Sequence, residues 1–91
     1  MAKLERQLTI CNQLGLHARA ATKLAVLAAT FDAEVTLIQG DKQASAASVL
    51  GLLMLESGKG KTITLQSEGK DAQAALDAIS TLIDAKFDEA N

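Results

Sequence analysis

Apolar and polar residues alternate near the start of the chain. Leu8 and Ile10 would point to one side of an extended segment. Thr9 and Cys11 would point to the other side. This alternation predicts a half-buried β-strand that ends at Asn12, with Cys11 on the face opposite the two apolar side chains.

A helical spacing replaces the alternation from Ala18 to about Thr30. Apolar residues recur there every three or four positions, while Arg19 and Lys23 lie on the other side of the helix. The apolar positions are Ala21, Leu24, Ala25, Ala28 and Phe31. This spacing predicts an amphipathic helix with one face in the core.

Two further strands and a turn are predicted after this helix. Val35 and Leu37 alternate with polar residues, as in a strand with one buried face. The pair Gly40 and Asp41 suits a tight turn that leads into a third strand at residues 43–46. The two strands are therefore expected to form a hairpin.

A short apolar helix is predicted at residues 49–55, with Ser48 as its N-cap residue. A small domain cannot bury every side of such a helix. After a glycine-containing loop, Ile63 and Leu65 alternate with polar residues and predict a fourth strand.

The last predicted helix has the longest apolar stripe in the chain. It begins after Gly69, with Asp71 as the expected N-cap residue. The stripe consists of Ala72, Ala75, Leu76, Ile79, Leu82, Ile83 and Phe87. The resulting order, β-α-β-β-α-β-α, predicts an α+β fold in which helices cover one face of an antiparallel sheet. At this length we expect one domain over residues 1–91.

The composition argues against several classes of protein. Nine Lys and Arg residues against eleven Asp and Glu residues give a net charge of −2, so the chain lacks the basic field that binds nucleic acids and anionic membranes. The longest apolar stretch, residues 49–55, is far too short to cross a bilayer. A single cysteine, Cys11, and a start without the apolar core of a signal peptide predict a cytoplasmic location.

His17 is the only histidine, and it stands where the first predicted strand gives way to the first helix. Unpaired N–H groups and the positive end of the helix dipole attract anions at such a position. A neutral imidazole is also a competent nucleophile near neutral pH. These properties suit a phosphoryl group, although a lone surface histidine at a helix start is more often a bystander.

Two other kinds of site are rejected. Residues 60–62, GKT, end like a nucleotide-binding P-loop, but Leu55 replaces the first glycine of that motif and a strand follows. One histidine and one cysteine on separate faces make no metal site. A reactive role for Cys11 is not expected.

Two motifs resemble those of a known family. Residues 14–19, LGLHAR, closely match the active-centre motif of the HPr family of histidine-containing phosphocarriers, which belong to the phosphoenolpyruvate-dependent phosphotransferase system. Residues 48–55, SVLGLLML, followed by GKG at 58–60, resemble the second motif of that family. The resemblance covers the whole chain. It implies an open-faced β-sandwich, with a four-stranded antiparallel sheet and three helices on one face.

The resemblance implies a relay of phosphate through His17. Nδ1 of this residue would accept a phosphoryl group from the phosphohistidine of Enzyme I and pass it to a histidine of a IIA-type protein. Arg19 and the backbone N–H groups of Ala18 and Arg19 would stabilise the moving charge. The family resemblance also implies a carrier without a cofactor, which we expect to be a monomer rather than a stand-alone enzyme.

Two alternatives stay open at the second motif. Ser48 matches a position that a dedicated serine kinase phosphorylates in some family members, but a role as helix N-cap also explains it. The short helix is either wholly core or a docking patch for partner proteins. That patch would consist of Val49, Leu50, Leu53 and Met54.

Three segments resemble the nitrogen-related branch of the family, which is tied to regulation rather than to sugar uptake. They are residues 17–21, 52–55 and 87–89. The chain departs from the family at Ala20, where most members have proline, and at Thr30, where many have glycine. Because a β-branched residue resists a left-handed conformation, the first helix is expected to end differently.

The alternative from a different class is a small α+β regulatory or ligand-sensing module. In that case His17 would be incidental and the short apolar helix would be a dimer interface. Labelling with Enzyme I and radioactive phosphoenolpyruvate separates the two hypotheses.

Overall fold

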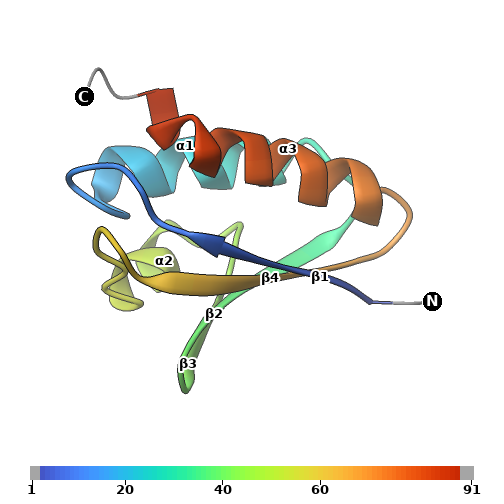
Figure 1. Cartoon of the computed structure of the whole chain (residues 1–91). Helices are drawn as coiled ribbons and strands as arrows, with labels where there is room; N and C mark the ends of the chain where they lie inside the picture. The colour runs from blue at the N-terminus through green and yellow to red at the C-terminus, as the bar shows by residue number, and fades with distance from the viewer. Residues whose placement is uncertain (1–2, 89–91) are drawn as a thin grey trace.

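The computed structural model describes residues 3–88, with four strands and three α-helices in the predicted order (Figure 1). The elements are β1 (Leu4–Thr9), α1 (Ala18–Ala28), β2 (Glu34–Gln39), β3 (Lys42–Ser45), α2 (Val49–Met54), β4 (Thr62–Glu68), α3 (Ala72–Asp84) and a final 3-10 turn, η1 (Lys86–Asp88). None of the helices in this described part has the length and apolar character needed to span a bilayer.

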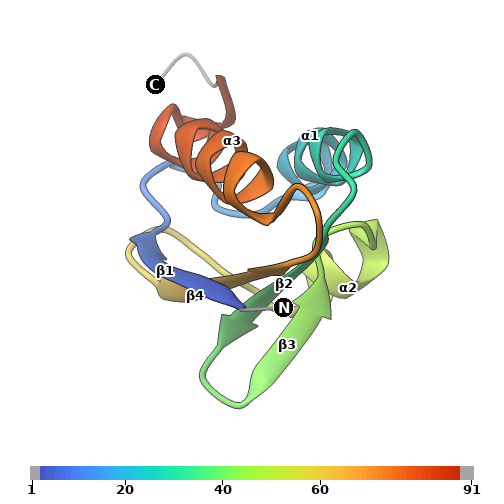
Figure 2. The same cartoon turned by 90° about the vertical axis from the view of Figure 1, so that its right-hand side faces the viewer.

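The strands form one antiparallel sheet in the order β1-β4-β2-β3. β1 and β4 are far apart in sequence, yet they pair from Leu4 opposite Ser67 to Thr9 opposite Thr62. Figures 1 and 2 show α1 and α3 side by side over one face of the sheet, while α2 lies next to β3 and contacts α1. The structure confirms an α+β fold with a four-stranded antiparallel sheet and three helices.

The core lies between the sheet and the layer formed by α1 and α3. Alternate residues of β2 and β4 point into it, so that Leu37 lies opposite Leu65 across the strand pair. Leu24 of α1 and Ile79 of α3 belong to the same cluster, and all four side chains are fully buried. The buried faces therefore follow the alternating and helical spacings of the sequence.

The structure corrects the end of β1, which stops at Thr9 rather than at Asn12. Ile10 continues the contact with the chain beside β4, because its N–H donates to a backbone carbonyl there at 2.9 Å. Cys11 lies beyond the end of β1, and the prediction that it occupies the strand face opposite Leu8 and Ile10 is wrong. Its thiol points to the C-terminal end of α3, where Sγ lies 3.5 Å from the Ile83 carbonyl oxygen.

The C-terminal end of α1 also differs from the predicted limit. The helix ends at Ala28, two residues before Thr30. The Thr30 hydroxyl donates to the Leu27 carbonyl at 2.7 Å and so closes the last turn. The C-cap residue, Ala29, has a φ of −67° and is not left-handed. Thr30 has no positive φ either, so the helix ends without a left-handed residue, as expected of a β-branched residue at this position.

The last helix begins where the sequence predicts, with Asp71 in the N-cap position, but its C-terminal end differs. The Asp71 carboxylate makes no capping bond to the helix and instead accepts the N–H of Asp32 at 2.7 Å. α3 ends at Asp84, and Phe87 does not continue its apolar stripe, because the chain turns back there with a φ of 54°. Phe87 is nevertheless buried against α1 and α3, and its carbonyl accepts a bond from Lys23 Nζ at 3.0 Å.

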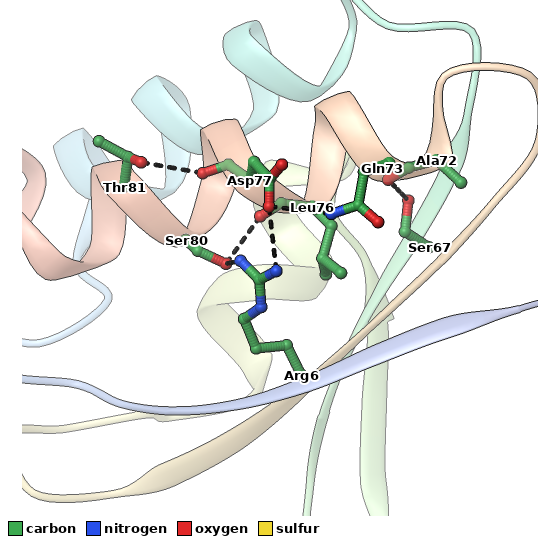
Figure 3. Close-up of polar contacts among 8 residues, drawn as sticks. All are labelled: Arg6, Ser67, Ala72, Gln73, Leu76, Asp77, Ser80 and Thr81. Atoms are coloured by element: carbon green, nitrogen blue, oxygen red, sulfur yellow. Dashed lines mark hydrogen bonds and ion pairs between the residues drawn. The ribbon is translucent and has the colours of Figure 1, made fainter.

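Arg6 of β1 joins the sheet to α3 at a polar point of their interface (Figure 3). Its guanidinium donates to the Ser80 hydroxyl and to the Asp77 carboxylate, both at 3.0 Å. Gln73, one helical turn earlier, donates to the same Asp77 oxygen at 3.0 Å. The Gln73 amide and the Arg6 guanidinium hold the pKa of Asp77 below its usual value of 3.8.

Asp77→Asn should lower the free energy of unfolding at neutral pH and have almost no effect in strong acid. A carboxylate with a depressed folded-state pKa contributes stability above its unfolded pKa and loses it as the pH falls through the folded pKa. The effect should be small, because Asp77 is exposed and solvent screens its charge. Urea unfolding across the acid range measures it, with Asp41→Asn on the β2–β3 turn as control. A difference that persists unchanged into strong acid would contradict this assignment.

Candidate functional site

His17 immediately precedes α1. Its backbone is extended, with φ of −82° and ψ of 179°, and its carbonyl accepts the N–H of Ala21 at 2.8 Å. The N–H groups of Ala18, Arg19 and Ala20 come before this first helical bond, at the positive end of the helix dipole. His17 therefore lies at a helix N-terminus, where the sequence predicts it.

A tight turn holds the chain just before His17. Asn12 is fully buried, and its Nδ2 donates to the Gly15 carbonyl at 2.7 Å. The Gly15 N–H donates back to the Asn12 carbonyl at 3.2 Å. The His17 N–H also donates to the Gly15 carbonyl, at 3.0 Å. The backbone at His17 is thus fixed by a turn whose side-chain support is a buried asparagine.

This turn packs directly on the loop that follows α2. The Leu16 N–H donates to the Ser57 carbonyl at 2.9 Å. Gly15 has a φ of 65°, and a Cβ at this position would lie 2.6 Å from the Ser57 carbonyl oxygen and 2.8 Å from Gly58 Cα. Only glycine allows both this backbone conformation and this close approach.

Sequence reasoning did not identify Asn12 and Ser57 as parts of the site. The alternation in the sequence places Asn12 at the end of a strand, and Ser57 belongs to no periodic pattern. The one local signal is an asparagine followed three residues later by glycine, a combination that suits a turn. Nothing in the sequence indicates that Ser57 lies beneath this turn, because the contact joins two distant loops.

Ser48 caps α2 as predicted, since its hydroxyl accepts the N–H of Gly51 at 3.0 Å. Gly51 lets this short helix lie close to β3. A Cβ on Gly51 would be 3.2 Å from Ala44 Cβ and 3.1 Å from Ser48 Oγ, which is tighter than ordinary contact.

The four residues of the predicted patch on α2 differ in their exposure to solvent. Leu50 and Met54 are 70% and 66% exposed. Val49 and Leu53 are half-buried and pack against the core. Leu14, on the loop before α1, is another large apolar side chain that is 64% exposed. Apolar side chains are therefore exposed both on α2 and on the loop that carries the histidine.

A groove of about 660 Å³ lies between α2 and β3. An ion pair stands in its wall, with Lys42 Nζ and Glu56 Oε2 3.0 Å apart. The groove is lined by Lys42, Gln43, Gly51, Leu53, Met54, Leu55 and Glu56. His17 is not one of the lining residues, so the groove is separate from the histidine.

Residues 3–88 contain no cluster of three His, Cys, Asp or Glu side chains that could hold a metal ion. Arg19 is exposed at the second position of α1, on the helix end that carries His17. The groups available for chemistry there are an imidazole, a guanidinium and backbone N–H donors, a set suited to an anionic group such as phosphate.

Comparison with known proteins decides the family. A family model described as "PTS HPr component phosphorylation site" matches residues 4–85. The chain belongs to the HPr family of phosphocarrier proteins. It is 76% identical to the phosphocarrier protein NPr of Shewanella violacea over 91 residues, the full length of both chains. This full-length identity supports its place in the NPr branch of the HPr family.

Other HPr-family proteins extend the likeness. The chain is 45% identical to the phosphocarrier protein HPr of Cupriavidus necator over 86 residues, which cover 94% of this chain and 97% of the other. A crystal structure of an HPr from Thermoanaerobacter tengcongensis matches it with a TM-score of 0.92 at 32% identity, covering 97% and 99% of the two chains. The fold described above is therefore that of HPr proteins.

Two features of the HPr resemblance can be placed on the structure. Ala20, which stands at the usual family proline, is fully buried in the first turn of α1. It keeps the helix and supplies a backbone N–H that proline lacks. Of the tail segment that resembles the NPr branch, Phe87 is buried and Glu89 lies outside the described residues.

Gly15→Ala should destabilise the protein more than Gly40→Ala. Both glycines have positive φ, at 65° and 60°, so alanine costs about 1–2 kcal/mol at either position. A collision with backbone should add about 1–3 kcal/mol at Gly15 alone, since nothing lies within 4 Å of the Cβ position at Gly40. Thermal melts of the two variants give the comparison, and equal losses would refute the close approach of the two loops.

Proposed function

We propose that this protein relays a phosphoryl group from Enzyme I to a IIA-type protein through phosphohistidine at His17. The position of its only histidine carries the proposal, because that residue lies at the N-terminus of α1 within the family motif at residues 14–19. A phosphoryl group on His17 would lie near backbone N–H groups at the positive end of the helix.

In the proposed step, Nδ1 of His17 attacks the phosphorus atom of the donor phosphohistidine. A new N–P bond forms while the donor N–P bond breaks, and the electron pair of the broken bond stays on the donor imidazole. The same exchange in the next step moves the group from His17 to the acceptor histidine. Phosphoryl transfer depends mainly on positioning and charge stabilisation. Arg19 and the N–H groups of Ala18 and Arg19 would supply that stabilisation.

We further propose that both partners dock on the α2 patch formed by Val49, Leu50, Leu53 and Met54. Leu50 and Met54 present apolar side chains to solvent, and an exposed apolar surface on a small domain is a common mark of protein contact. Val49 and Leu53 would form the half-buried base of the patch and hold its shape against the core.

Ser48 is proposed as the target of a serine kinase. A phosphate on this residue would stand at the edge of the α2 patch, because Ser48 directly precedes Val49. Its negative charge is compatible with the start of a helix but would oppose the approach of an acidic partner surface. Modification would then act on docking rather than on the chemistry of His17.

The proposed setting is the regulatory, nitrogen-type branch of the phosphotransferase system in the bacterial cytoplasm. The 76% identity to an NPr supports this branch. The protein would act as a monomer, as one domain over residues 1–91, and without a cofactor, because the histidine itself accepts and donates the phosphoryl group.

His17→Ala should abolish phosphoryl acceptance and leave the fold intact. The half-buried imidazole is not part of the hydrophobic core, so its removal should change the melting temperature little. The measurement is labelling with Enzyme I and radioactive phosphoenolpyruvate, together with a thermal melt. Label on the wild type should be acid-labile and alkali-stable, as a phosphoramidate is. Undiminished labelling of the variant would exclude His17 as the carrier residue.

Leu50→Glu and Leu52→Glu form a matched pair that tests docking. Leu50 is 70% exposed and Leu52 is fully buried in the same helix. Leu50→Glu should raise the Enzyme I concentration needed for half-maximal phosphorylation by about fivefold or more, with an unchanged melt. Leu52→Glu should instead lower stability by several kcal/mol, because an unpaired carboxylate would enter the core. Wild-type dependence on Enzyme I for Leu50→Glu would remove it from the docking surface.

A further inference from the structure

Ser57 packs beneath the turn at residues 12–17, which is called the His17 loop. It is 3% exposed, and its carbonyl accepts the N–H of Leu16, the residue directly before His17. Its hydroxyl donates to Oε1 of Gln39, the last residue of β2. One buried serine therefore connects the sheet to the backbone that precedes the histidine.

The segment that carries Ser57 is attached to the β2–β3 hairpin at two successive residues. Glu56 has a φ of 55°, which turns the chain sharply just after α2. Its carboxylate pairs with Lys42 of β3, with Oε2 and Nζ 3.0 Å apart. Ser57 is bonded to Gln39 on the adjacent strand. The exposed ion pair contributes little rigidity, whereas the Ser57 hydroxyl makes its bond from a buried position.

The backbone above Ser57 has little room to adjust independently. A Cβ on Gly15 would lie 2.6 Å from the Ser57 carbonyl oxygen, so the two backbone segments are already in close contact. The carbonyl of Gly15 accepts the N–H of His17 at 3.0 Å. A displacement of Ser57 would therefore be passed through Gly15 and Leu16 to His17.

We propose that the Ser57 hydroxyl, held by Gln39, is a positioning group that sets the orientation of the His17 loop for phosphoryl transfer. This inference rests on the proposed role of His17 as the phosphoryl carrier. Because Ser57 is buried and its hydroxyl bonds Gln39 rather than a residue of the α2 patch, we expect it to act on the transfer step and not on the affinity for Enzyme I. The position of an attacking atom strongly affects the rate of such a step.

The test compares Ser57→Ala with Ser67→Ala. Ser67 is also buried, and its hydroxyl donates one bond, to the Ala72 carbonyl at 2.9 Å, beside the start of α3. Both variants lose one buried hydroxyl, but only Ser57 supports the His17 loop. The measurement is the single-turnover rate of phosphorylation by phosphorylated Enzyme I, over a range of donor concentrations and at a temperature where melts show both variants folded.

Ser57→Ala should lower the rate at saturating donor by about three- to tenfold, which corresponds to the loss of one hydrogen bond. The donor concentration at half-maximal rate should not change. Ser67→Ala should keep the wild-type rate. Wild-type rates for Ser57→Ala, or equal slowing in the two variants, would overturn the positioning role.

Substitutions of Gln39 test the same bond from its other side and serve if Ser57→Ala does not fold. Gln39→Glu keeps an oxygen that accepts the Ser57 hydroxyl and should retain most of the rate, whereas Gln39→Leu should be slowed. The double variant Ser57→Ala/Gln39→Leu should be no slower than Ser57→Ala alone. Additive losses would overturn the proposed coupling. Absence of acid-labile label on the wild type itself would instead count against the proposed function of His17.

Discussion

The close backbone contact between two loops at one end of the sheet is the constraint on which the candidate site depends. Leu16 donates to the Ser57 carbonyl, and Gly15 approaches that carbonyl too closely for any side chain. The contact is available because β1 and β4 are neighbours in the sheet, so the loop after β1 and the loop before β4 leave it side by side. The sheet order therefore determines where the histidine at the start of α1 can lie.

The short helix α2 has one buried side that packs on the core and one side that is exposed to solvent. Leu52 is fully buried, while Leu50 and Met54 are largely exposed. Gly51 brings the helix close to β3, so six residues suffice to anchor it. In a helix of six residues, buried and exposed positions alternate within less than two turns. Neighbouring residues therefore face the core and the solvent in turn.

The faces of the strands and helices were predictable because side-chain direction follows from the local period of two or 3.6 residues. The starts of the helices were also predictable, but some of the other ends and terminal contacts were not. β1 stops before Asn12 because that side chain bonds the turn at Gly15. Asp71 bonds Asp32, a residue far away in sequence, rather than its own helix. Phe87 is buried by a reversal of the chain rather than by helical spacing. At Asp71 and Phe87 a contact with a distant segment overrode the local pattern, and at Asn12 a side-chain bond within the turn did so.

By itself, the sequence determined the α+β order, the core-facing residues and His17 as the candidate carrier at a helix start, because these depend on short-range spacing and on a compact motif. What supports that histidine became visible in the folded molecule. The bond between Ser57 and Gln39 joins residues 18 positions apart on different elements. The contact of Ser57 with Leu16 spans an even longer stretch of chain. Such contacts leave no periodic trace in the sequence, since they arise only when the sheet brings the loops together.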